Sequence, residues 1–291
     1  MTRLRAGLIF SGLLLGVVAI LPCPAFSAAP AGAPLPTASP VLASHKALYS
    51  VSLTSTRAGA DYLDVSGKMV LEFTDTCDAW TTNQKSMLRT VSGEGTEDVS
   101  SSDFAAWENK AGDDYKFSVR QTQNGDVSEF RGRARRSGPN GSGVAEYTKP
   151  ERKTYQLPPH FLFQTAQQVK LIEYAQKGGR FFSGEMFDGS EGGGAARFNA
   201  IILKPPQGMD GALKSPLLDS PPHRVRIAFY PAAGTEDKDG QASADTGEQP
   251  EYEMTMTVHD NGVVSDYDYD YEDFSVHGSL MAIQALPRPH C

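Results

Sequence analysis

Apolar residues recur at every second position in one segment of this chain after another, and glycine, proline or asparagine separates the segments. In residues 45–53, for example, Tyr49 and Val51 fall on one face, while Ser50 and Ser52 fall on the other. A period of two is typical of strands with one buried face. The strands predicted in this way cover residues 45–53, 68–73, 77–91, 104–108, 115–121, 127–133, 144–147, 180–187, 197–203, 223–230, 251–259, 263–274 and 280–286.

One segment changes to the period of a helix. Residues 165–177 are predicted as the principal helix, with Thr165 as its N-cap and Gly178 at its C-terminal cap. Its apolar stripe consists of Ala166, Val169, Ile172 and Ala175.

The turns indicate antiparallel pairing between neighbouring strands. Asn124 and Gly125 both tolerate a positive φ and favour a type I′ hairpin turn. Residues 260–262, Asp-Asn-Gly, predict a second tight turn. We therefore expect a mainly all-β fold of about 12 to 14 antiparallel strands with one principal helix, closed into a barrel, a coiled half-barrel or a sandwich.

The N-terminus has the three parts of a secretory signal peptide, which we assign to residues 1–27. Arg3 and Arg5 supply the positive charge, and residues 8–21 form an apolar stretch that is shorter than the roughly 20 residues of a membrane span. The mature protein is therefore expected to be soluble and periplasmic, with no transmembrane anchor.

Two alternatives concern how this leader is processed. Cleavage after Ser27 is favoured, and cleavage after Ala29 is the other option. Cys23 could instead be lipidated, but Pro22 stands where a lipidation signal needs a small residue. Under the favoured alternative Cys23 leaves with the leader.

The rest of the chain divides into a lead-in and one domain. Residues 28–44 are mostly Ala, Pro, Ser and Leu without periodicity, which predicts a disordered lead-in. Residues 45–291 have a length suited to one large β domain. The net charge of −8, which becomes more negative without the leader, argues against binding nucleic acid through charge.

After removal of the leader two cysteines remain, Cys77 and Cys291. In an exported protein such a pair predicts a disulfide that ties the end of the fold to its beginning. Free thiols and an intermolecular link remain the alternatives. A redox-active pair is disfavoured because the chain has no Cys-x-x-Cys spacing.

The motifs of the common enzymes and metal proteins are missing from the sequence. We find no Gly-x-Ser-x-Gly elbow and no Ser-x-x-Lys with its usual partners. No two of the six histidines have metal-binding spacing, so no metal site, cofactor or catalytic residue is predicted. The histidines are His45, His160, His223, His259, His277 and His290.

Three further segments invite a functional interpretation, and each has a simpler structural one. Residues 266–273 alternate acids with tyrosines, but they lack the glycine turn and the final glutamate of a calcium loop. A strand with its tyrosines packed and its acids solvated explains the pattern better. The Gly-rich residues 189–194 predict a flexible hairpin connection, not a phosphate loop. Arg131, Arg133 and Arg135 predict a basic strand face, either solvated or facing acidic envelope components.

Several short motifs together resemble the EipB-like family of alphaproteobacterial periplasmic cell-envelope integrity proteins, long classed as a domain of unknown function. They cover nearly the whole mature chain and include residues 45–49, 67–69, 77–80, 157–158, 161–165, 186–189, 250–253, 260–263 and 271–274, with Cys291 at the end.

The resemblance implies an open-barrel β-spiral with a helix against it and a disulfide between Cys77 and Cys291. It also implies a role in maintaining the cell envelope under stress, with no established catalytic activity. We expect a non-enzymatic protein that binds a periplasmic protein or an envelope component such as a lipid or peptidoglycan. The alternatives are a carrier of an apolar ligand on the concave face of the sheet and, less favoured, an envelope hydrolase.

Overall fold

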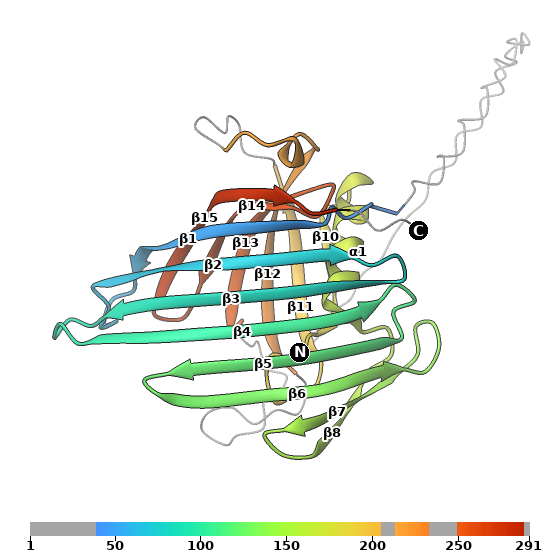
Figure 1. Cartoon of the computed structure of the whole chain (residues 1–291), viewed down its shortest axis with the longest axis horizontal. Helices are drawn as coiled ribbons and strands as arrows, with labels where there is room; N and C mark the ends of the chain where they lie inside the picture. The colour runs from blue at the N-terminus through green and yellow to red at the C-terminus, as the bar shows by residue number, and fades with distance from the viewer. Residues whose placement is uncertain (1–38, 205–212, 233–248, 288–291) are drawn as a thin grey trace, which may run out of the picture. The chain divides into compact units, whose positions relative to one another are not determined.

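The computed structural model describes residues 39–204, 213–232 and 249–287, which all belong to a unit that spans Ala38–Cys291. A single sheet contains all the strands of this part of the chain (Figure 1). The elements are β1 (His45–Thr56), β2 (Asp64–Asp75), β3 (Ala79–Val91), β4 (Glu97–Asn109), β5 (Asp114–Gln123), β6 (Asp126–Arg136), β7 (Gly143–Lys149), β8 (Lys153–Leu157), β9 (Leu162–Phe163), α1 (Gln164–Gln176), β10 (Phe181–Phe187), β11 (Ala196–Leu203), η1 (Pro216–Leu218), β12 (Pro222–Ala232), β13 (Tyr252–His259), β14 (Val264–Asp270) and β15 (Phe274–Ala285).

The first and last strands of the sheet in sequence pair in its middle. The strand order is β8-β7-β6-β5-β4-β3-β2-β1-β15-β14-β13-β12-β11-β10-β9, and β8 and β9 are its two edges. Neighbours are antiparallel except for β9 and β10, which pair in parallel over two residues. The chain therefore builds one half of the sheet outward from β1, and the other half returns to β15.

The sheet curls so that its two halves face each other. Figure 1 shows β1–β6 in front, β10–β14 behind them, and α1 beside the strands of the rear half. A right-handed twist between neighbouring strands accumulates over so many strands and produces such coiling. The predicted predominantly β fold with one principal helix is confirmed, with fifteen strands in the described ranges in place of about 12 to 14.

Two core clusters occupy much of the space that the curled sheet encloses. One lies between α1 and the strands on both sides of the β1–β15 pair, and it includes Tyr49, Ile172 and Val258. The other is largely aromatic and lies under β4–β8. In this second cluster the rings of Tyr115 and Phe163 stack with their centroids 4.8 Å apart.

The helix begins differently from the prediction, whereas its C-terminal glycine behaves as predicted. It starts at Gln164, and no side chain of the preceding Phe163 caps it, so Thr165 is inside the first turn and is not the N-cap. Its C-terminus is as predicted, because Gly178 takes a φ of +75° and donates its N–H to the carbonyl of Ala175.

The packed structure starts before β1. Leu42, Ala43 and Ser44, within the predicted lead-in, are buried. The N–H of Ala43 donates to the carbonyl of Asn261 at 2.8 Å, in the turn between β13 and β14. Burial and this hydrogen bond order a segment whose composition alone suggests disorder.

The predicted strand boundaries need two corrections. The strand predicted at 263–274 ends at Asp270, because a turn closed by the 2.9 Å hydrogen bond from Tyr271 N–H to the Phe274 carbonyl separates β14 from β15. This turn has no glycine or proline, so the alternating pattern runs through it. The strand predicted separately at 280–286 is the later part of β15, which starts at Phe274. The short strands β8 and β9 lack a clear alternation and were not predicted.

Candidate functional site

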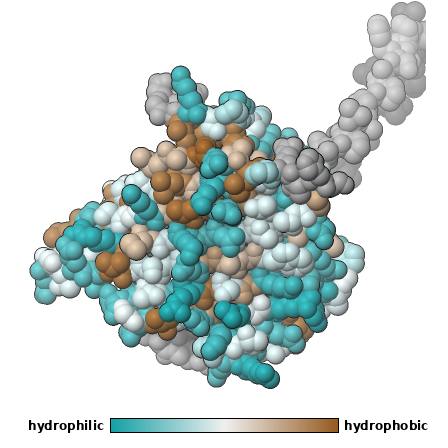
Figure 2. Space-filling model, in the orientation of Figure 1, coloured by the Kyte–Doolittle hydropathy of each residue, from teal (hydrophilic) through white to brown (hydrophobic). Residues whose placement is uncertain are grey.

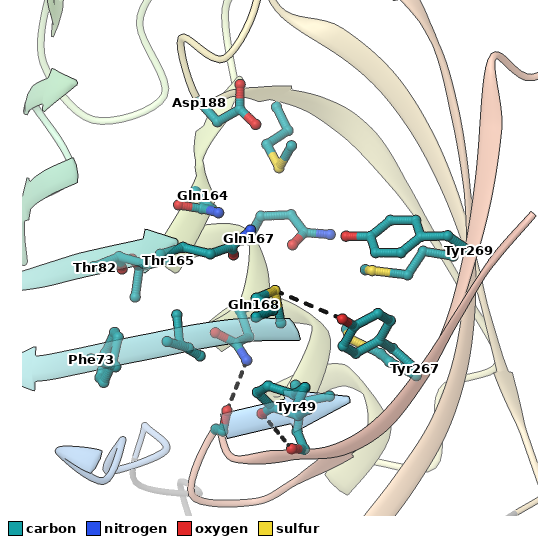
Figure 3. A pocket seen from close by; sticks show the side chains of 18 of the residues that line it. Tyr49, Phe73, Thr82, Gln164, Thr165, Gln167, Gln168, Asp188, Tyr267 and Tyr269 are labelled. Carbon is teal, nitrogen blue, oxygen red and sulfur yellow. Dashed lines mark hydrogen bonds between the residues drawn. The ribbon is translucent and has the colours of Figure 1, made fainter. Parts of the chain in front are cut away.

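A cavity of about 220 Å³ lies between α1 and the concave face of the sheet. Strands β1, β2 and β3 line one side of it, and β12, β13 and β14 line the opposite side. Figure 3 shows side chains from both halves of the sheet pointing toward one another across this space. The cavity therefore exists only because the sheet curls.

Tyrosines, phenylalanines and methionines together make up almost half of the residues that line the cavity. The alternating run in β14 places Tyr267 and Tyr269 on this wall, as predicted for a packed face. The hydroxyl of Tyr267 lies 3.8 Å from the sulfur of Met69 on β2 (Figure 3). Flexible methionines adapt their shape to different apolar groups, and four of them line the cavity. They are Met69, Met186, Met254 and Met256.

The acids that alternate with these tyrosines form ion pairs, which corrects the expectation of simple solvation. Arg224 on β12 pairs with both Asp266 and Asp268, and His277 Nδ1 lies 2.7 Å from a carboxylate oxygen of Asp268. Arg57 pairs with Asp270 at 2.9 Å. Ion pairs thus connect the outer face of β14 to neighbouring residues, while its inner face lines the cavity.

Part of the polar lining of the cavity comes from α1, and Thr82 and Gln84 on β3 also contribute to it. Gln168 Nε2 donates to the carbonyl of Gly262 at 3.0 Å, which anchors the helix to the β13–β14 turn. Gln164 Oε1 and Gln167 Nε2 are buried and have no hydrogen-bond partner among the described residues. Figure 3 shows the Gln167 side chain reaching across the cavity toward Tyr269.

His45 adds a third polar atom to this wall. Its Nδ1 lies 2.7 Å from the carbonyl of Ala43, so Nδ1 carries the proton. Its Nε2 is then an acceptor, and it has no partner within residues 39–204, 213–232 and 249–287. Burial lowers the pKa of His45, which keeps the ring neutral at neutral pH.

The cavity wall carries little charge. Among the described residues that line it there is no lysine or arginine, and Asp188 is the one carboxylate. Oδ1 of Asp188 accepts hydrogen bonds from the backbone N–H and the hydroxyl of Ser190. Burial raises the pKa of Tyr252, Tyr267 and Tyr269, so these hydroxyls stay protonated.

A buried carboxylate holds the helix against the sheet. Glu108 on β4 is 1% exposed and accepts the backbone N–H groups of Thr165 and Ala166 at 2.7 and 2.8 Å. Burial raises the pKa of Glu108 to about 7, although these two N–H groups and the nearby Arg136 oppose the shift. Glu108 therefore does what a local N-cap residue would do, from a distant strand.

Three tyrosines hold the loop between β10 and β11. The hydroxyls of Tyr115, Tyr147 and Tyr155 donate to the carbonyls of Asp188, Glu191 and Gly192, at 3.1, 2.5 and 2.8 Å. The Gly-rich connection is thus tied to β5, β7 and β8. This loop links the two ends of the sheet where their strands do not pair.

The predicted basic face lies on the outside of the sheet. Arg131 and Arg133 on β6 line an open groove over β3–β7, together with Trp107 and Lys116, whose Nζ lies 4.7 Å from the Trp107 ring centroid. Arg133 also pairs with Asp114. Figure 2 shows that this side of the molecule is mostly hydrophilic or of intermediate hydropathy, with separate hydrophobic patches.

The predicted disulfide is only partly within the described residues. Cys77 lies between β2 and β3 with a φ of +73°, and Cys291 lies outside the residues that the structure describes. Ser44 joins the two ends concerned: its hydroxyl accepts the N–H of Asp75 and its carbonyl accepts the N–H of Leu286, both at 2.9 Å. The Cys77–Cys291 bridge stays a prediction.

No three His, Cys, Asp or Glu side chains of the described ranges converge in an arrangement that could hold a metal ion. No helix in those ranges has the length and apolar character needed to cross a membrane. The histidines are dispersed: His223 lies 2.6 Å from Asp260, and His259 contacts the carbonyl of Ser220.

Local sequence gives little sign of the residues that define this site. Glu108 stands in an ordinary strand pattern, 57 positions from Thr165. The spacing of Gln164, Gln167 and Gln168 is the available signal, because positions three and four apart share one helix face. A polar stripe on a helix usually faces solvent, so this spacing by itself does not distinguish a cavity wall from an exposed face.

Comparison with known proteins agrees with this architecture. The chain is 25% identical over 247 residues to the cell envelope integrity protein EipB of Brucella abortus (strain 2308), which covers 83% of this chain and 84% of that protein. It is also similar to the crystal structure of a β-barrel-like protein of unknown function from Brucella abortus. The TM-score is 0.73 at 24% identity, covering 85% of this chain and 99% of that one. The model of the EipB-like family matches residues 36–287, and the chain therefore belongs to the EipB-like family.

Proposed function

We propose that this protein is a non-enzymatic periplasmic protein that supports the integrity of the cell envelope by binding an apolar or amphipathic envelope component in the cavity under α1. Membership of the EipB-like family and the name of the Brucella relative support the envelope role. The leader-like N-terminus supports a periplasmic location.

The cavity is the observation that carries the binding function. Its volume of about 220 Å³ lies inside a β-spiral that would otherwise be expected to fill its core with side chains. A concave, mostly apolar space with a few polar groups is typical of small-molecule sites. The cavity therefore favours binding of a ligand on the concave face of the sheet. A protein that served only as a scaffold for other proteins would be expected to have a filled core.

The chemistry of the lining favours binding over catalysis. Amides such as Gln164 and Gln167 do not ionise at neutral pH, so they do not act as general acids or bases. The tyrosines have a pKa raised by burial, which removes them further from acid–base work at neutral pH. These groups can orient a ligand without transforming it.

The binding function is tested with an apolar dye. Purified wild-type protein should enhance the fluorescence of N-phenyl-1-naphthylamine, and native mass spectrometry of gently purified protein should detect a co-purifying amphiphile. Met254→Trp should fill the cavity and reduce dye binding by about tenfold or more. Met281→Trp is the matched control, since Met281 is 57% exposed on β15.

The envelope role is tested in cells. A strain that lacks the gene should become sensitive to detergent and to cell-wall antibiotics. Wild-type protein and Met281→Trp should restore resistance, whereas Met254→Trp should not. Equal rescue by Met254→Trp at matched protein levels would refute a role for the cavity, and normal growth of the deletion strain under these stresses would refute the envelope role.

A further inference from the structure

We propose that the cavity selects an amphiphile with an uncharged, hydroxyl-bearing polar head, such as a monoacylglycerol, and that Gln164 and Gln167 of α1 hydrogen-bond this head. This inference rests on the proposed binding function and names the class of ligand.

The first step is that two buried amide atoms at the cavity have no hydrogen-bond partner among the described residues. Gln167 is 5% exposed, lies on the cavity wall and has an Nε2 with no partner among the described residues. Oε1 of Gln164, one helical turn away, is also buried and unpartnered in the same ranges. Buried polar groups are generally hydrogen-bonded, so these two atoms indicate the position of a missing partner.

The second step is that the helix cannot easily turn these amides away. Glu108 fixes the first turn of α1 at Thr165 and Ala166, and Gln168 is bonded to Gly262 on the other side. Gln167 lies between these two anchors and Gln164 directly precedes the first, so both amides belong to a turn of α1 whose position is fixed. A preorganised pair of this kind lowers the cost of ligand binding.

The third step is the charge of the wall. An anionic head would lose its hydration on entering the cavity and would find no lysine or arginine on the described wall to pair with. It would also be repelled by the carboxylate of Asp188. A cationic head could pair with Asp188, but it would offer no acceptor to the N–H groups of Gln167 and would leave this buried donor unpaired. A neutral head satisfies the wall without burying an unpaired charge.

The fourth step is the pattern of donors and acceptors. Gln167 Nε2 donates, whereas Gln164 Oε1 accepts. A hydroxyl can satisfy both types, because it has one donor and two acceptor positions. An ester carbonyl next to hydroxyls adds a further acceptor, while methionines such as Met69 and Met254 contact the acyl chain.

The experiment uses the full mature chain and three amphiphiles with the same twelve-carbon chain, each below its micelle concentration. They are monolauroylglycerol, laurate and dodecyltrimethylammonium, and displacement of N-phenyl-1-naphthylamine measures their affinities. Monolauroylglycerol is expected to bind at least about tenfold more tightly than either charged compound.

Variants test the two amides. Gln167→Leu and Gln164→Leu should each weaken monolauroylglycerol by about tenfold and leave binding of the dye unchanged or stronger. Gln176→Leu is the matched control, because Gln176 is exposed on the same helix. Thermal unfolding verifies that each variant is folded, which is expected because leucine has a similar size and leaves no new polar group unpaired.

The outcomes separate this inference from the proposed function. If laurate or the ammonium compound binds as tightly as monolauroylglycerol, or if the leucine variants keep the wild-type preference, the head-group inference is wrong and the binding function stands. If neither the dye nor any amphiphile binds, both fail.

Discussion

Glu108, on a strand in the front half of the sheet, accepts the backbone N–H of Thr165 at 2.7 Å in the first turn of the only α-helix in the described ranges. The same carboxylate accepts the next N–H, from Ala166. One side chain therefore couples the position of α1, and with it the glutamine wall of the cavity, to β4.

Removal of this carboxylate should destabilise the fold. Glu108→Ala leaves two buried N–H groups without their acceptor, and we expect the free energy of unfolding to fall by about 2–4 kcal/mol. Denaturant unfolding measures the loss. Glu94→Ala, at an exposed loop position, is the control and should change stability by less than about 0.5 kcal/mol. A loss no larger than that of the control would show that the helix does not depend on Glu108.

The raised pKa of Glu108 should make stability depend on pH. Its pKa is about 7 in the folded protein and about 4.5 in the unfolded chain. A group with a raised folded pKa contributes stability that is present below its unfolded pKa and is lost as the pH rises through its folded pKa. The wild type should therefore lose about 1–3 kcal/mol more than Glu108→Gln between about pH 5 and pH 8. Parallel pH profiles for the two proteins would contradict this assignment.

The tyrosines that hydrogen-bond to the loop between β10 and β11 should stabilise its conformation. Tyr147→Phe removes a hydroxyl that donates to the Glu191 carbonyl, and we expect a loss of about 0.5–1.5 kcal/mol in the free energy of unfolding. Hydrogen exchange of the amides in residues 188–194 should also become faster. Tyr62→Phe is the control, since no hydrogen bond to the Tyr62 hydroxyl is seen among the described residues. Unchanged exchange in the loop would mean that packing alone holds it.

The disulfide between Cys77 and Cys291 should tie the C-terminal segment to the β2–β3 connection. Asp75 and Leu286 both hydrogen-bond to Ser44, so the segments next to Cys77 and Cys291 start close together. The five residues that follow Leu286, up to Cys291, can span at most about 17 Å. Closing so long a loop stabilises by at most about 5 kcal/mol in the chain-entropy view. Cys77→Ser should therefore unfold at a lower denaturant concentration than the oxidised wild type. Detection of two free thiols in exported protein by alkylation and intact-mass analysis would exclude the bridge.

Much of the secondary structure could be predicted from the sequence because its signals are local. Asn124 and Gly125 adopt φ values of +52° and +89°, as the predicted type I′ turn requires. Gly178 ends the helix in the predicted left-handed conformation. Both depend on steric preferences of the residue itself, which hold wherever the chain is placed.

Predictions from local sequence were wrong at positions whose contacts come from residues far away in the chain. Thr165 matches an N-cap pattern, yet Glu108 supplies the acceptors, so the helix starts one residue earlier. Leu42 lies in a segment of disordered composition, yet it is buried in the fold and lines the cavity. In each case tertiary contacts outweigh a weak local preference.

The sequence by itself determined that the chain forms a strand-rich fold with one amphipathic helix, since alternation and turn residues act between near neighbours. The tertiary structure alone decided that β1 pairs with β15, that the sheet curls instead of closing, and that a cavity remains under α1. Contacts such as the 2.7 Å hydrogen bond from the Tyr49 hydroxyl to the carbonyl of Val264 join residues 215 positions apart. No local pattern specifies such a pair, because its geometry arises only when the accumulated twist of the whole sheet brings the two strands together.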